Sequence, residues 1–194
     1  SSDLAESARA RMATDAEWAG IALADQARDL ARARGPEEAR RYLESSKALF
    51  APANYEALWA WAEASRALGR FDAASARIEA LYRKQPAESG PAIAWARVLA
   101  AREAFAEAHA VLEPVAEREA GSLAAQVDLG KALASLERFD EAVERFDRAD
   151  RLDPLSAEAG YLACVSLERS GRTKDASAHA TASASRPSSH ARRT

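Results

Sequence analysis

The sequence predicts an all-α fold built from repeated helical hairpins, and three observations support this. The aromatic residues Phe71, Phe105 and Phe139 recur at one constant spacing, a repeat period of about 34 residues. Apolar residues within one period recur at helical spacing, as Leu129 and Leu133 do. Alanine, the best helix former, dominates the apolar residues, whereas the residues that favour sheets are sparse.

Composition narrows the class of protein. The chain has 194 residues, which suits one compact domain or one short repeat array. It is 48% hydrophobic and 29% charged, so the composition is that of neither a disordered nor a membrane protein. A net charge of −3 gives no reason to expect nucleic acid as the partner. The single cysteine, Cys164, excludes an internal disulfide.

The same repeat period holds at further positions. One set of small residues that follows it is Ala74, Ala108, Ala142 and Ala176. A second set is Trp61, Trp95, Leu129 and Ala163. Four repeat frames therefore start at Tyr55, Ser89, Leu123 and Ala157.

Each frame predicts two helices joined by a short turn. Gly69 and Gly171 lie where the first helix must stop. Asp72 and Asp140 lie at the start of the second helix, where an N-cap or first-turn acid is favoured. Pro154 then ends the second helix and redirects the chain.

These residues resemble the tetratricopeptide repeat. The best match is 123–156, which carries Leu129-Gly130, Leu133, Ala142, Phe146, Ala149 and Pro154 at the signature spacing. The resemblance covers about 170 residues and implies a right-handed superhelical solenoid of antiparallel helix hairpins, with about ten to twelve helices. It implies a binding architecture and does not imply a reaction.

The repeat frame predicts the organisation of the chain. The predicted parts are a capping helix or half-repeat at 1–19, a degenerate repeat at 20–54, repeats at 55–88, 89–122 and 123–156, a repeat acting as a C-terminal cap at 157–186, and a mobile tail at 187–194. Terminal units must shield a face that a neighbour would otherwise cover.

Residues that could carry chemistry are scarce. None of His109, His179 and His190 has another His or a Cys three or four residues away, so no metal site is expected. No phosphate-binding loop or nucleophile elbow is present, so we expect no catalytic residue, no cofactor and no enzymatic activity. Cys164 takes the small-residue position of Gly130 one repeat earlier, which favours a packed, unreactive thiol.

The resemblance implies that the first helices of successive hairpins line a concave groove. The predicted inward positions are Ala24, Trp59, Ile93, Val127 and Tyr161, and one turn further along are Arg28, Glu63, Arg97, Lys131 and Val165. From these we predict a partner-binding groove of Trp59, Glu63, Arg66, Ile93, Arg97, Val127, Lys131 and Tyr161. Trp61 and Trp95 are predicted to lie in the core. The alternative that Trp59 and Tyr161 only fill space in the hairpin packing stays open.

Three functions remain at this stage. The first is a scaffold or adaptor that binds a peptide segment or helix of a partner protein, for the assembly of a bacterial complex. The second is a regulatory or substrate-positioning module of a larger enzyme, such as a glycosyltransferase, whose catalytic part lies upstream. The third is stacking of the array into homo-oligomers. A cytoplasmic location is favoured, or a periplasmic one if an upstream signal was removed.

Overall fold

The computed structural model describes residues 19–46, 49–50, 54–154 and 157–184. Within these ranges every regular element is a helix, as the sequence predicts. The capping helix predicted at 1–19 and the tail predicted at 187–194 lie, apart from residue 19, outside the described residues.

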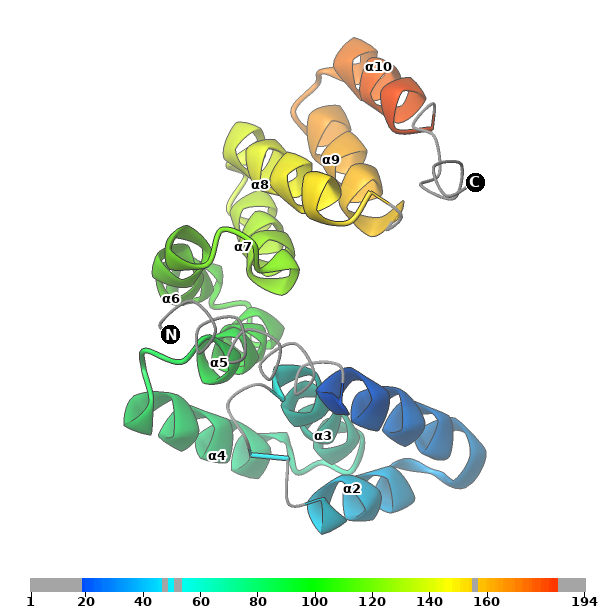
Figure 1. The fold of residues 1–194 in the computed structure, drawn as a ribbon, viewed down its shortest axis with the longest axis vertical. Coiled ribbons are helices and arrows are strands. Elements are labelled where there is room, and N and C mark those ends of the chain that lie inside the picture. Colours follow the sequence, from blue (N-terminus) through cyan, green and yellow to red (C-terminus); the bar gives the residue numbers. More distant parts are fainter. Residues whose placement is uncertain (1–18, 47–48, 51–53, 155–156, 185–194) are drawn as a thin grey trace, which may run out of the picture. The chain divides into compact units, whose positions relative to one another are not determined.

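The helices follow one another in hairpins (Figure 1). A helix over residues 19–34 comes first. The others are α2 (Pro36–Ser45), α3 (Tyr55–Ala67), α4 (Phe71–Lys84), α5 (Ser89–Ala101), α6 (Phe105–Arg118), α7 (Leu123–Ser135), α8 (Phe139–Leu152), α9 (Ala157–Arg169) and α10 (Thr173–Ala184). The odd-numbered helices from α3 to α9 begin one repeat period apart, at the predicted frame starts.

The chain divides into two compact units, Ser1–Val98 and Leu99–Thr194, and the boundary falls inside α5. In the first unit α3 packs against α2 and α4. In the second unit α7 packs against α6 and α8, and α9 packs against α8 and α10. The direction of superhelical winding depends on how the two units are placed, and it stays a prediction.

The turn between the two helices of a repeat has one backbone form. Gly69, Glu103, Glu137 and Gly171 all have positive φ, between 61° and 82°, and successive members of this series are again one repeat period apart. The next residue closes the turn on the preceding helix, as where the Arg138 amide donates to the Leu133 carbonyl oxygen at 3.0 Å. The two glycines adopt this conformation without steric cost, whereas the two glutamates adopt it at the cost of backbone strain.

Small residues bring the helices of a hairpin close together in the second unit. A Cβ atom on Gly130 of α7 would lie 2.5 Å from Cε1 of Phe146 on α8. Phe146 itself is fully buried, as are Ala142 and Ala149 on the same helix. The large ring therefore occupies the space that the missing side chain leaves, which explains the pairing of glycine with phenylalanine.

A pair of aromatic rings packs at the core of the first unit. Trp61 is buried on α3, and Phe50 meets its ring edge-on at a centroid distance of 5.7 Å. The Arg77 guanidinium lies 3.8 Å from the centroid of the Phe50 ring. Trp95 on α5 is buried as well, so the prediction that Trp61 and Trp95 are core residues is confirmed.

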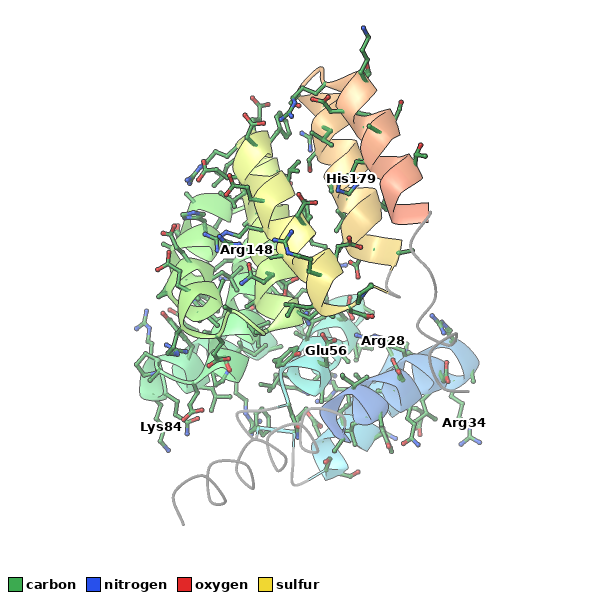
Figure 2. All side chains as sticks on the ribbon, turned by 45° about the horizontal axis from the view of Figure 1, so that its top comes forward. Arg28, Arg34, Glu56, Lys84, Arg148 and His179 are labelled. Carbon is green, nitrogen blue, oxygen red and sulfur yellow. The ribbon has the colours of Figure 1, made fainter. Side chains whose placement is uncertain are left out.

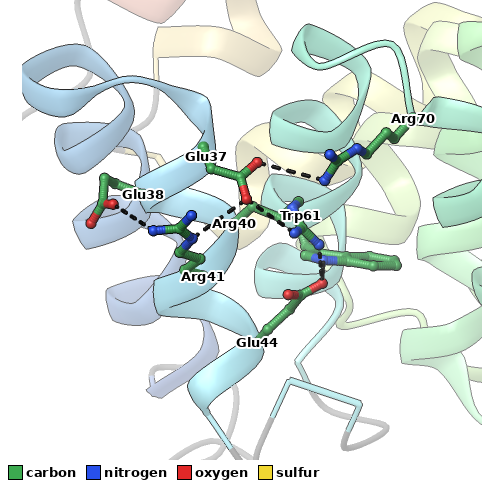
Figure 3. A network of polar contacts seen from close by, with 7 residues as sticks. All are labelled: Glu37, Glu38, Arg40, Arg41, Glu44, Trp61 and Arg70. Atoms are coloured by element: carbon green, nitrogen blue, oxygen red, sulfur yellow. Dashed lines mark hydrogen bonds and ion pairs between the residues drawn. The ribbon is translucent and has the colours of Figure 1, made fainter.

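A polar network joins α2 to its neighbours at the edge of this core (Figure 3). Glu44 accepts a hydrogen bond from Nε1 of Trp61 at 3.1 Å, which gives the buried indole its partner. Arg40 donates to Glu37 and Glu44 of its own helix, and Arg70, before α4, lies 3.6 Å from Glu37. The hydrogen bond from Arg40 lowers the pKa of Glu37. These contacts fix α2 against α3 and against the turn before α4.

The strained turn leads to a stability prediction. A non-glycine residue in the left-handed region costs about 1–2 kcal/mol of strain. Replacement by glycine relieves this strain, but the greater chain entropy of glycine in the unfolded state offsets part of the gain in stability. We expect Glu137→Gly to raise the free energy of unfolding in urea by about 1 kcal/mol. Glu137→Ala is the matched control, because it removes the side chain and keeps the strained backbone. Equal stability of the two variants would contradict the turn assignment.

Candidate functional site

In the first unit one carboxylate joins three first helices. Glu56 at the start of α3 accepts from Nη2 of Arg28, on the helix over residues 19–34, at 3.3 Å. It also accepts from Nη1 of Arg97 on α5 at 2.8 Å. Figure 2 labels Arg28 and Glu56 on their two helices. Arg97, which the sequence predicts at the edge of the groove, is thus held in an internal ion pair.

Arg97 is tied down further by an aromatic ring. Its guanidinium lies 5.4 Å from the ring centroid of Tyr55, a cation–π contact, and only 17% of its side chain is exposed. An ion pair of this kind already satisfies most of the charge that a partner would need to meet. Arg97 therefore acts mainly as a link between α3 and α5.

Three of the predicted site residues lie on one face of α3. Trp59 and Glu63 are half-buried and Arg66 is exposed, and the spacings of four and three residues place them on adjacent turns. Ile93 on α5, predicted to line the same groove, is 1% exposed. The first unit consequently offers Trp59, Glu63 and Arg66 to a partner, whereas Ile93 is part of the packed interior.

In the second unit the predicted groove residue Val127 is covered by the next repeat. Val127 on α7 is 8% exposed and packs with Ala149 of α8 and Ala159 of α9. Leu123 and Leu162 pack around this cluster. Val127 therefore seals the contact between two successive repeats and presents little surface.

Lys131 and Tyr161 remain accessible in the second unit. Nζ of Lys131 on α7 lies 2.7 Å from Oε1 of Glu158 on α9, and about half of each side chain is exposed. Exposed pairs of this kind contribute only about 0.2–1 kcal/mol, so a partner can displace them at little cost. Tyr161 on α9 is 68% exposed. It is the most exposed large hydrophobic side chain in the described part of the chain.

The acidic partners of these cations were missed at the level of sequence. Glu56 and Glu158 are three repeat periods apart, so they occupy the same repeat position. Each accepts an ion pair from the preceding first helix, from Arg28 and from Lys131. The spacing was a usable signal, because stacked repeats bring the same positions of successive first helices next to one another.

The described residues also bear on metal binding and on membrane insertion. No group of three or more His, Cys, Asp or Glu side chains in these ranges is arranged to hold a metal ion. In the same part of the chain, every helix is too short or too polar to cross a bilayer.

Comparison with known proteins identifies the repeat. Residues 99–163 match the family model of the tetratricopeptide repeat. This stretch of the chain therefore carries a tetratricopeptide repeat. No curated protein matches the sequence at a significant level.

Solved structures with tetratricopeptide-like folds resemble most of this chain. MamA, residue 41 to the end, from Desulfovibrio magneticus RS-1 matches with a TM-score of 0.60 and 22% identity, over 85% of this chain and 93% of that one. MamA of MSR-1 matches with a TM-score of 0.58 and 24% identity, over 85% and 94%. A putative kinesin light chain from Podosopora anserina, with nearly identical TPR-like repeats, matches with a TM-score of 0.61 and 19% identity, over 84% and 92%. At these identities the likeness concerns the fold alone.

A short chain of polar contacts joins α8, α9 and α10. Nδ1 of His179 on α10 lies 3.6 Å from Sγ of Cys164 on α9, and its Nε2 lies 2.8 Å from Oδ1 of Asp147 on α8. The thiol also points at the Ala176 carbonyl oxygen, at 3.7 Å. Burial, with a smaller effect of the Glu168 and Asp147 carboxylates, raises the pKa of Cys164. The arrangement fixes α10 against two helices and keeps the thiol protonated.

The raised pKa predicts a slow thiol. Because the thiolate is the nucleophile, we expect Cys164 to react with iodoacetamide at pH 8 several-fold more slowly than an exposed cysteine. Its rate should still be rising at pH values where an ordinary thiol has reached its plateau. The control is Ser135→Cys in a Cys164→Ala background, since Ser135 is exposed at the end of α7. A Cys164 rate equal to that of the control would refute the buried-thiol description.

Proposed function

We propose that this protein is a non-enzymatic scaffold that binds a peptide segment or helix of a partner protein on the face formed by its first helices. The tetratricopeptide fold supports this, because stacked hairpins present an extended, preformed surface for binding. A preformed surface loses little conformational entropy on binding. In this proposal the scaffold serves the assembly of a protein complex.

One observation carries the proposal. On the first-helix face of the second unit, the exposed Tyr161 lies one turn from Glu158, which pairs with Lys131 of the preceding first helix. An exposed aromatic beside a displaceable ion pair is the combination that protein interfaces use for an anchor and its polar rim. In the first unit the half-buried Trp59 lies on α3 with Glu63 and Arg66 on the adjacent turns.

Burial and internal contacts determine which of the predicted groove residues can contact a partner. Ile93 and Val127 are not proposed as contact residues, because both are buried. Arg97 is not proposed either, because Glu56 and Tyr55 hold its side chain. The proposed contact residues are Trp59, Glu63, Arg66, Lys131 and Tyr161.

Photo-crosslinking tests the face directly. Benzoylphenylalanine placed at position 59, on a first helix, should give adducts with a partner protein in extracts of the native organism. The same amino acid at position 83, where the exposed Arg83 lies on the second helix α4, should give none with that partner. Equal crosslinking from both positions, or from position 83 alone, would move the binding site to the second helices.

A pair of tryptophans on α3 separates binding from folding. Truncating an aromatic anchor weakens binding by a factor of about 10 or more. In calorimetry, Trp59→Ala should therefore bind the crosslinked partner more weakly to that extent, and the variant should retain its helicity. Trp61→Ala should lower the free energy of unfolding by about 3–5 kcal/mol, because Trp61 is buried and hydrogen-bonded to Glu44. If Trp59→Ala unfolds the protein as Trp61→Ala does, Trp59 only fills space in the hairpin.

A further inference from the structure

Glu63 on α3 is a half-buried carboxylate that no other residue of the described chain satisfies. It forms neither an ion pair nor a hydrogen bond with any described residue. Every other half-buried glutamate in the described ranges has an Arg or His nitrogen within 3.8 Å, and these are Glu37, Glu38, Glu56, Glu79, Glu113 and Glu119. Taking a carboxylate partly out of water is costly unless a cation or a hydrogen-bond donor meets it. The exception therefore marks an acid that a partner can pair.

The basic residues of the neighbouring first helices are held by a different acid. Glu56 accepts from Arg28, on the helix over residues 19–34, at 3.3 Å and from Arg97 on α5 at 2.8 Å. Arg97 occupies on α5 the repeat position that Glu63 occupies on α3, so the charge at this position is reversed between the two repeats. The chain thus places an acid at Glu63 and commits the nearby arginines to Glu56.

The groups next to Glu63 on its own helix are an aromatic ring and one exposed arginine. Trp59 lies one turn before Glu63 on the same face, which puts their Cβ atoms about 5–6 Å apart. Helical side chains lean toward the N-terminus, so the Glu63 carboxylate is directed at the turn that carries Trp59. Within the described ranges no guanidinium lies over the Trp59 ring. Arg66, three residues after Glu63, is exposed and does not pair with it.

The first turn of α3 shows what a ring and a carboxylate on one helix bind in this protein. Tyr55 and Glu56 together hold a single guanidinium, that of Arg97. It lies 5.4 Å from the centroid of the Tyr55 ring and 2.8 Å from Oε1 of Glu56. A guanidinium is suited to both contacts, because its plane stacks on aromatic rings and its fork of donors matches a carboxylate. Trp59 and Glu63 offer the same two groups one turn further along the helix.

We propose that Trp59 and Glu63 bind an arginine side chain of the partner protein, with the guanidinium stacked on the indole ring and paired with the carboxylate. This rests on the proposed scaffold function and names the side chain that the first-helix face recognises. The positive charge of Arg66 disfavours a second cation beside the first. The site therefore selects a single arginine and discriminates against a run of basic residues.

Other cations match these groups less well. Lysine carries a compact, strongly hydrated charge, which stacks less well on a ring and cannot pair with both carboxylate oxygens as a fork does. A divalent metal ion takes several oxygen ligands, and the described residues hold no group of three acidic, His or Cys side chains placed for one. Arginine is the cation that uses both Trp59 and Glu63.

Two blocked tripeptides test the site on the full chain. One has arginine between two alanines, and the other has citrulline in its place, which keeps the shape and removes the charge. The indole N–H signal of Trp59, identified with Trp59→Phe, is followed by heteronuclear NMR. We expect the arginine tripeptide to shift this signal saturably and the citrulline tripeptide to bind at least about threefold more weakly. Equal titrations with both tripeptides, or no shift with either, overturn the proposal.

Charge-removing variants separate recognition from folding. Glu63→Gln should bind the arginine tripeptide at least about threefold more weakly and keep the thermal midpoint of the unaltered chain, because Glu63 has no partner among the described residues. Glu56→Gln should lower that midpoint, because Glu56 holds Arg28 and Arg97. Glu117→Gln is the matched control for lost charge, since Glu117 is exposed on the second helix α6, and it should bind as the unaltered chain does.

Two results with these variants would contradict the assignment of Glu63. One is a midpoint for Glu63→Gln as low as that of Glu56→Gln, which would make Glu63 a structural residue. The other is equal binding of the arginine tripeptide by Glu63→Gln and Glu117→Gln, which would show that this carboxylate does not recognise the guanidinium.

The scaffold function and the arginine site can fail separately. If position 59 crosslinks a partner segment that has no arginine next to the crosslink, the arginine site fails while the scaffold function stands. If the arginine tripeptide binds in a manner that depends on Glu63 and no protein is crosslinked, the scaffold function fails and the arginine site stands. Where an arginine is found, its replacement by glutamate should abolish binding, and Glu63→Arg should restore part of it.

Discussion

A Cβ atom on Gly130 would come within 2.5 Å of the Phe146 ring, so α7 and α8 pack as they do only because that atom is missing. The same condition recurs along the chain through alanines spaced by one repeat period. Ala74, Ala108, Ala142 and Ala176, each on the second helix of its hairpin, are all buried. Dense interiors tolerate no added volume, so this series sets the distance between paired helices and, through it, the repeat.

Close hairpins determine what is left for binding. Once each interior is filled by its own hairpin, the next repeat covers the outward face, which is why Val127 is buried against Ala159 of α9. Ion pairs between first helices, such as that of Lys131 with Glu158, then line the rim of this surface. What remains is an aromatic and polar surface of the kind that a binding scaffold requires.

The sequence predicted the helices and the turns between them, and it showed small residues that recur at the repeat period. Each of these depends on local chemistry that repeats. It did not predict that Glu137 takes the same left-handed conformation as Gly171, since nothing in a glutamate indicates it. Burial of Ile93 and Val127 in the predicted groove was also missed, because it depends on which helix covers a position and not on its own type. The contact between Nε2 of His109 on α6 and Nη1 of Arg138 in the next hairpin, 3.2 Å apart, was missed for the same reason.

Two alanines on α6 test the claim that small residues set the hairpin. Ala108 is fully buried in the series above, and Ala110, two residues later, is exposed. The measurement is the free energy of unfolding in urea for Ala108→Leu and Ala110→Leu. Overpacking should lower it by about 1–3 kcal/mol for Ala108→Leu, whereas Ala110→Leu should stay within about 0.5 kcal/mol of the unaltered chain. Equal stabilities for the two variants would contradict the account.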